Sequence, residues 1–198
     1  VGLSIGFSAF SSVLQIQSSA TVKPDSSTMN VDFSSSSTEV LTEKITPTVT
    51  GTTATATDAT IDNTSAPTIS NLSATFTAPG QKAVYSFYAY NAGELEAFLK
   101  SIVYSNATGG TAPKVCTAKS GTTDTLVQNA CNGISLKVKV GTEAEVSGGK
   151  AGITTHSLAK KTSEKVEVTI EYAADADRAD GDFTVSFGDV TLNYSSTD

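Results

Sequence analysis

The single histidine of this 198-residue chain, His156, is the first side chain to examine, because an imidazole can act as a general base or bind a metal. It follows two threonines, and no HExxH pattern surrounds it. Residue counting alone leaves a Ser-His-Asp triad open, but the sequence has no Gly-x-Ser-x-Gly turn to present a nucleophilic serine. We therefore expect no catalytic residue, metal or cofactor, and we interpret His156 as an ordinary surface or turn residue.

Two cysteines, Cys116 and Cys131, bracket a stretch rich in threonine. In an exported chain such a pair predicts a disulfide, which would stabilise the fold by about 3 kcal/mol by closing a short loop. The alternative is two buried free thiols. A metal site has less support, because no histidine or further cysteine is near in the sequence.

Four aspartates, Asp175, Asp177, Asp180 and Asp182, form an acidic cluster near the end of the chain. Clustered carboxylates suit Ca²⁺, which takes six to eight oxygen ligands. The spacing misses the EF-hand pattern, because Ala179 stands where a third ligand would be. We interpret the cluster as a solvated hairpin loop between two strands, since charge runs usually face solvent.

Four Asn-x-Ser/Thr triplets are candidate glycosylation sites. They begin at Asn63, Asn71, Asn106 and Asn193. Serine and threonine make up more than a quarter of the residues, so such triplets also arise by chance. The sequence alone leaves their use open.

The composition indicates an all-β protein, because Thr, Val, Ile, Tyr and Phe carry the apolar pattern and these residues favour strands. The net charge of −7 argues against nucleic acid and anionic membrane surfaces as partners. No apolar run reaches the ~18–20 residues that a membrane span needs. The chain begins at Val1 rather than methionine, which predicts a secreted protein whose signal has been removed.

The N-terminal segment alternates apolar residues with glycine or serine, and this period of two predicts a strand. The apolar positions are Val1, Leu3, Ile5, Phe7 and Ala9. An isolated strand cannot bury its apolar face or satisfy its backbone, and no turn pairs it with a neighbour. We expect residues 1–16 to act as a donor strand that completes the sheet of a neighbouring subunit. The alternatives are a strand folded into its own subunit, a signal-peptide remnant and a type IV pilin helix.

Apolar alternation continues along the chain and predicts many short strands. They cover residues 68–76, 84–90, 95–104, 134–140, 166–172 and 183–194, with a bulge or tight turn at Gly188. Ala78, Pro79 and Gly80 predict a turn. Residues 46–65 are either a polar strand pair or a flexible connection. This pattern predicts one antiparallel β-sandwich or jelly-roll domain over residues 17–198.

The run of residues 69–72, 78–82 and 85–93 follows a rhythm of strand, Pro-Gly turn, strand and Asn-x-Gly turn. In this it resembles the TasA/camelysin family of biofilm-matrix proteins, over roughly residues 66–194 plus the N-terminal segment, with archaeal bundling pili and threads as related assemblies. The resemblance implies a jelly-roll subunit that receives the N-terminal strand of a neighbour. It also implies an extracellular, cell-surface filament made of copies of this chain, supporting a biofilm matrix or cell–cell adhesion.

A secreted monomeric β-sandwich adhesin or ligand-binding module is the alternative function. Carbohydrate-binding modules usually present exposed aromatic side chains for stacking, whereas this chain has no tryptophan and its tyrosines lie mostly within strand patterns. We therefore expect a structural protein that assembles with itself, not an enzyme.

Overall fold

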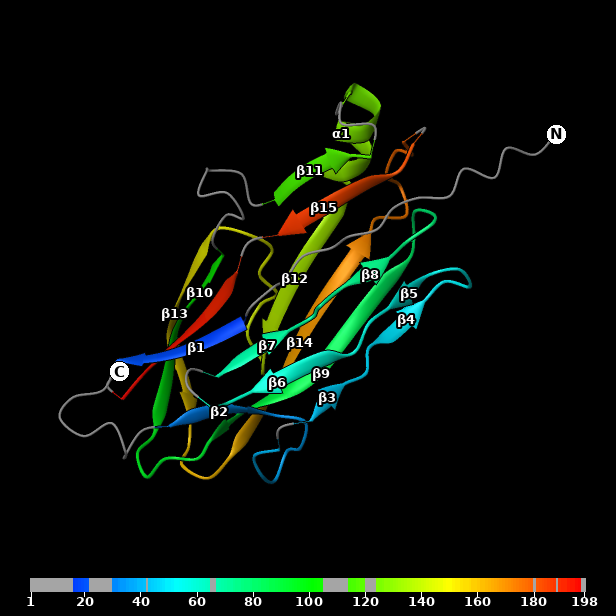
Figure 1. Cartoon of the computed structure of the whole chain (residues 1–198). Coiled ribbons are helices and arrows are strands. Elements are labelled where there is room, and N and C mark those ends of the chain that lie inside the picture. The colour runs from blue at the N-terminus through cyan, green and yellow to red at the C-terminus, as the bar shows by residue number, and fades with distance from the viewer. Residues whose placement is uncertain are drawn as a thin grey trace.

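The computed structural model describes residues 16–21, 30–41, 43–64, 67–104, 114–119, 124–179, 181–187 and 189–196. This part of the chain is mostly β-structure in antiparallel sheets with one short helix, α1 (Thr125–Asn132), which confirms the predicted class (Figure 1). The strands are β1 (Ile16–Thr21), β2 (Val31–Ser34), β3 (Lys44–Ile45), β4 (Thr48–Thr50), β5 (Thr55–Ala56), β6 (Ala59–Asp62), β7 (Thr68–Ser70), β8 (Ala74–Thr75), β9 (Lys82–Asn91), β10 (Ala97–Tyr104), β11 (Lys114–Ala118), β12 (Ile134–Val140), β13 (Lys150–Leu158), β14 (Ser163–Tyr172), β15 (Phe183–Phe187) and β16 (Val190–Ser195).

The larger sheet has seven strands in the order β13-β10-β16-β1-β7-β6-β3. Its only parallel neighbours among these strands are β1 and β16, with Ile16 opposite Val190. β1 also pairs antiparallel with β7 at its first two residues. The first described strand is therefore an interior strand of the larger sheet, flanked by a strand from the far end of the chain.

The second sheet has five strands, in the order β12-β14-β9-β2, with β4 also paired to β9. β9 is its central strand, as its apolar sequence predicted, and Tyr85, Phe87 and Ala89 are fully buried. The predicted strands over 134–140 and 166–172 are confirmed as β12 and β14, which pair along their whole shared length. Two further pairs, β11 with β15 and β5 with β8, form small sheets of their own.

Buried side chains from both large sheets belong to one continuous apolar core. Within it, the rings of Phe33 and Phe87 meet edge to face, with centroids 5.5 Å apart. Burying an aromatic or aliphatic side chain of this size contributes about 1.5–3 kcal/mol. The alternation of buried and partly exposed residues along β9, β12, β14 and β16 supplies a large share of this core.

Three predictions need correction or completion. The single strand predicted over 68–76 is wrong, because β7 and β8 pair with different strands and Asn71 between them has a positive φ of 63°. The described part of residues 46–65 is not a flexible connection, because it contains β4, β5 and β6. β4 pairs with β9, β5 pairs with β8, and β6 pairs with β3 and β7. β10 confirms the strand predicted over 95–104, beginning two residues later at Ala97.

The sequence patterns missed β11, β13 and α1. The helix begins after Asp124, whose carboxylate caps it by accepting from the Val127 N–H at 2.9 Å. Val127, Ala130 and Cys131 are its buried residues, and their spacing of three and four was a helical signal. The predicted strands near the C-terminus are confirmed as β15 and β16, but they belong to different sheets. The bulge or turn predicted at Gly188 lies outside the described residues.

Candidate functional site

The first candidate site is the edge of β15 that faces away from β11. Just beyond the β11–β15 pair, the Lys119 N–H donates to the Asp182 carbonyl at 2.9 Å. In an antiparallel pair every second residue of a strand is hydrogen-bonded to the partner strand, so this bond identifies which residues of β15 bond to β11. Thr184 therefore turns its backbone groups toward β11, whereas Phe183 and Val185 turn theirs toward the opposite edge. No strand of the described ranges pairs with Phe183 or Val185 on that edge.

This edge of β15 lies on the same side of the β10–β16 and β11–β15 pairs as β1. β11 follows β10 in the chain and β15 precedes β16, so the β11–β15 pair continues the β10–β16 pair in the same order (Figure 1). This edge of β15 therefore lies on the side on which β1 flanks β16. Phe183 and Val185 are only 1% and 0% exposed as whole residues, so their backbone groups are shielded from solvent as well as their side chains. A strand paired with them would extend the core layer. A pocket of about 310 Å³ at the far end of this ribbon is lined by residues of both β11 and β15.

The second strand edge of interest is that of β12, on the side away from β14. Val138 and Val146 exchange both backbone hydrogen bonds there, at 2.9 and 2.8 Å. By the alternation of an antiparallel pair, Ile134 and Leu136 also turn their backbone groups to this side. The segment of 141–149 that contains Val146 thus folds back over the edge of its own strand.

Side chains cover the rest of the β12 edge. The Tyr104 hydroxyl donates to the carbonyls of Val146 at 2.6 Å and Leu136 at 3.3 Å. The Lys114 ammonium donates to the carbonyls of Ile134 and of two residues at the end of α1. Burial lowers the pKa of Lys114 to about 8, while the surrounding carbonyl oxygens favour its protonated form. The hydrogen-bonded edge of β12 therefore contrasts with the edge of β15, with which no described strand pairs.

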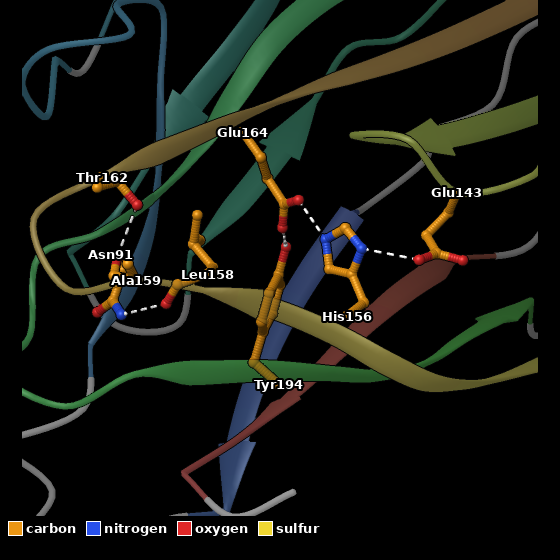
Figure 2. Close-up of polar contacts among 8 residues, drawn as sticks. All are labelled: Asn91, Glu143, His156, Leu158, Ala159, Thr162, Glu164 and Tyr194. Atoms are coloured by element: carbon orange, nitrogen blue, oxygen red, sulfur yellow. Dashed lines mark hydrogen bonds and ion pairs between the residues drawn. The ribbon is translucent and has the colours of Figure 1, made fainter.

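His156 is the centre of a buried polar cluster, so its assignment to the surface is wrong (Figure 2). Its Nδ1 lies 2.8 Å from a carboxylate oxygen of Glu143, and its Nε2 contacts the carboxylate of Glu164. The Tyr194 hydroxyl donates to the other oxygen of Glu164 at 2.6 Å. His156 comes from β13 and Tyr194 from β16, whereas Glu164 comes from β14, so the cluster joins the two large sheets.

The backbone explains how these side chains meet. Leu99 of β10 lies opposite both His156 and Tyr194 in the pairing, so all three side chains form one inward-facing row. Both pairings shift register between Leu99 and Ser101, and such irregularities re-aim neighbouring side chains. Alternation along β13 is therefore broken before His156, which is why sequence periodicity gave no sign that this residue is buried.

The electrostatics of the cluster follow from its burial. Burial by itself lowers the pKa of His156, but the charges and hydrogen bonds of Glu164 and Glu143 outweigh it and hold that pKa above its ordinary value. Burial and the adjacent Glu164 raise the pKa of Tyr194 well above its ordinary value, so the phenol stays neutral and donates. The partners of His156 are carboxylates rather than a serine or cysteine, an arrangement suited to an ion-pair lock.

Cys116 of β11 and Cys131 of α1 form the predicted disulfide, with Cα atoms 6.3 Å apart. The bond holds α1 against the strand that pairs with β15. It spans a sequence separation of 15 residues, a short loop for which the entropy model gives about 3 kcal/mol.

The acidic segment is a connection rather than the hairpin predicted. It joins β14 to β15, and these strands pair with other partners instead of with each other. Asp175, Asp177 and Asp182 are exposed, which agrees with a solvated loop, and Asp180 lies outside the described residues. Within the described ranges, no cluster of three or more His, Cys, Asp or Glu residues is arranged to hold a metal.

The candidate glycosylation sites differ in their surroundings. Asn63 is tied to the Phe33 backbone by two hydrogen bonds of 3.1 and 2.8 Å. Asn193 donates to Ser101 at 3.0 Å from within β16. Asn71 is exposed in the connection between β7 and β8. Asn106 and the predicted donor-strand residues, Val1, Leu3, Ile5, Phe7 and Ala9, lie outside the described residues.

In comparisons with known proteins, the chain matches no family model and no curated sequence. In the part of the chain that the structure describes, no helix combines the length and apolar character needed to cross a membrane.

Proposed function

We propose that this chain is a structural subunit of an extracellular, cell-surface filament, and that it polymerises by inserting its N-terminal strand into the neighbouring subunit. The single observation that carries the proposal is the edge of β15 at Phe183 and Val185, which is buried yet paired with no described strand. A sheet edge of this kind is a template for a further strand. The alternating N-terminal segment is the part of the sequence best suited to fill it.

The two features complement each other in shape and chemistry. The donor segment has one apolar face, and the edge of β15 continues a layer whose side chains are buried. Burying Leu3, Ile5 and Phe7 would contribute about 1.5–3 kcal/mol each, with ladder hydrogen bonds adding less per bond. The glycines and serines of the other face would let the strand enter a narrow space.

Transfer of the strand to a different copy gives the assembly its geometry. A donor strand that leaves one subunit and enters the next makes a heterologous contact, and heterologous contacts that do not close build filaments. The antiparallel sheets around one core are compatible with a jelly-roll subunit for such a filament. The disulfide supports an oxidising, extracellular location.

The test compares the full chain with a form lacking residues 1–12. Electron microscopy should show filaments of the full chain, and the truncated form should stay a folded monomer. A synthetic peptide of residues 1–15 should bind that monomer and raise its melting temperature. It should also slow amide exchange at Phe183 and Val185, because these N–H groups face the acceptor edge.

Two substitutions make a matched pair for the same test. Phe7→Asp should block elongation, because it places an unpaired charge on the face to be buried, whereas Phe7→Leu should retain it. Filaments formed by the truncated protein, or none from the full chain at any concentration, would overturn the proposal and favour a secreted monomeric adhesin or binding module. Peptide binding that leaves Phe183 and Val185 unprotected would move the acceptor to a different edge.

A further inference from the structure

The strap, residues 141–149, runs between β12 and β13 and covers the edge of β12. Its ends are held by backbone hydrogen bonds, from the Gly141 N–H to the Lys165 carbonyl and from the Tyr104 N–H to the Gly149 carbonyl, both at 2.8 Å. Between these ends, Val146 forms the bridge with Val138. The backbone groups of Val138 are therefore covered only while the bridge to Val146 is formed.

One strap side chain reaches the polar cluster. Glu143 contacts Nδ1 of His156 at 2.8 Å, while Nε2 contacts Glu164 on β14 (Figure 2). The Glu143 side chain is 30% exposed and the Glu164 side chain only 10%. Glu164 also accepts from Tyr194, so it is the more firmly held of the two carboxylates.

Protonation of His156 determines how many of these contacts can form. An imidazolium has two N–H donors and can serve both carboxylates, whereas a neutral imidazole has one donor and one lone pair. A lone pair directed at a carboxylate oxygen is repulsive, so the neutral ring keeps only one partner. Because Glu164 is more buried and is fixed by Tyr194, the remaining proton belongs on Nε2, and Glu143 loses its donor.

We propose that His156 is a proton-operated latch: when protonated it holds the strap over the edge of β12 through Glu143, and when neutral it keeps Glu164 and releases Glu143. Release weakens the bridge between Val146 and Val138 and uncovers the backbone groups of β12. This inference is independent of filament formation, because it concerns an edge other than that of β15.

Two carboxylates, one phenol and one apolar side chain determine the direction of the pH effect at His156. Glu143 faces His156 from the strap and Glu164 from β14, Tyr194 of β16 acts through Glu164, and β10 places the apolar Leu99 opposite the ring. The pKa of His156 is held above its ordinary value, so folding favours its protonated form. The latch is therefore fully closed below the ordinary histidine pKa of about 6.5 and opens as the pH rises through the raised value.

The test measures amide protection factors at Val138 and Val146 by hydrogen exchange from about pH 6 to about pH 9, a range chosen around the ordinary histidine pKa. Protection factors divide out the intrinsic pH dependence of exchange. Wild-type protection should fall by about tenfold, because losing a hydrogen bond to a charged group changes an equilibrium by about that factor. Glu143→Ala should have the low protection at every pH, because alanine offers neither a donor nor an acceptor to Nδ1. Glu145→Ala is the matched control, because Glu145 lies in the strap but contacts Lys137, and it should keep the pH dependence.

Nitrogen chemical shifts of His156 supply the second readout. At high pH the proton should be on Nε2, and the pH at which the ring titrates should match the midpoint for loss of protection. The proposal is overturned if protection at Val138 and Val146 stays constant while His156 titrates. It is also overturned if the neutral ring carries its proton on Nδ1, or if Glu145→Ala abolishes the pH dependence as Glu143→Ala does.

Discussion

The edges of β12 and β15 show two ways in which this chain treats the boundary of a sheet. At β12, the backbone groups of Val138 are taken by Val146, and two neighbouring carbonyls accept from Tyr104 and Lys114. At β15, Phe183 and Val185 turn their backbone groups to an edge on which no described strand pairs. An edge whose backbone groups are already hydrogen-bonded resists pairing with other chains, whereas an unpaired edge is a template for a further strand.

The difference shows that a strand edge can be protected by nearby groups without a further strand. At β12, one loop and two long side chains take up the hydrogen-bonding groups of the edge. The β11–β15 ribbon instead has a covalent bond that joins β11 to α1. We expect the two edges to respond differently when their supports are removed, and three variants measure that difference.

The largest effect is expected from removing the disulfide with Cys116→Ala and Cys131→Ala together. The free energy of unfolding should fall by about 3 kcal/mol, because the unfolded chain regains the entropy of the closed loop. Alanine is chosen because Cys131 is fully buried and a hydroxyl there would lack a partner. Denaturant titration measures the loss, with the exposed Thr117→Ala on the same strand as control. A loss below about 1 kcal/mol would show that the ribbon is held by packing alone, well under the usual range for disulfides.

A smaller effect is expected from Tyr194→Phe, which removes the hydroxyl that fixes Glu164. Hydrogen bonds to charged groups contribute roughly 1.5–3 kcal/mol, so we expect a loss of about 2 kcal/mol in urea unfolding. Tyr172→Phe is the matched control, because this buried tyrosine donates to a neutral carbonyl, that of Asp177, at 2.8 Å. Equal losses for the two variants would mean that the charge of Glu164 adds nothing to the lock.

The smallest effect is expected from Tyr104→Phe at the covered edge. Its hydroxyl serves two neutral carbonyls, so the loss of unfolding free energy should be about 1 kcal/mol. Exchange at the Val146 amide should quicken, since the strap loses one support. If the free energy of unfolding falls but the Val146 amide keeps its protection from exchange, Tyr104 stabilises the core and not the strap. The edge of β12 would then differ less from that of β15.

Local patterns predicted a large part of the fold. The strands β9, β12, β14, β15 and β16 follow from apolar residues at every second position, because a pleated strand puts alternate side chains on one face. The disulfide followed from the presence of two cysteines, on the expectation that the chain is exported. The sequence did not predict β13, because a bulge breaks its alternation of apolar residues. It did not predict α1, because a helix of eight residues has only about two turns in which a helical period can be recognised.

What the sequence by itself determined is therefore the β class, the strongly alternating strands, the cysteine pair and the exposed acidic segment. Tertiary structure alone decided that β1 lies beside β16, that β15 and β16 join different sheets, and that His156 is buried between Glu143 and Glu164. Periodicity reports which face of a strand is apolar, because that depends on the strand's own residues. Strand neighbours and the burial of a single polar residue depend on segments far apart in sequence, whose meeting is set by the packing of the whole core.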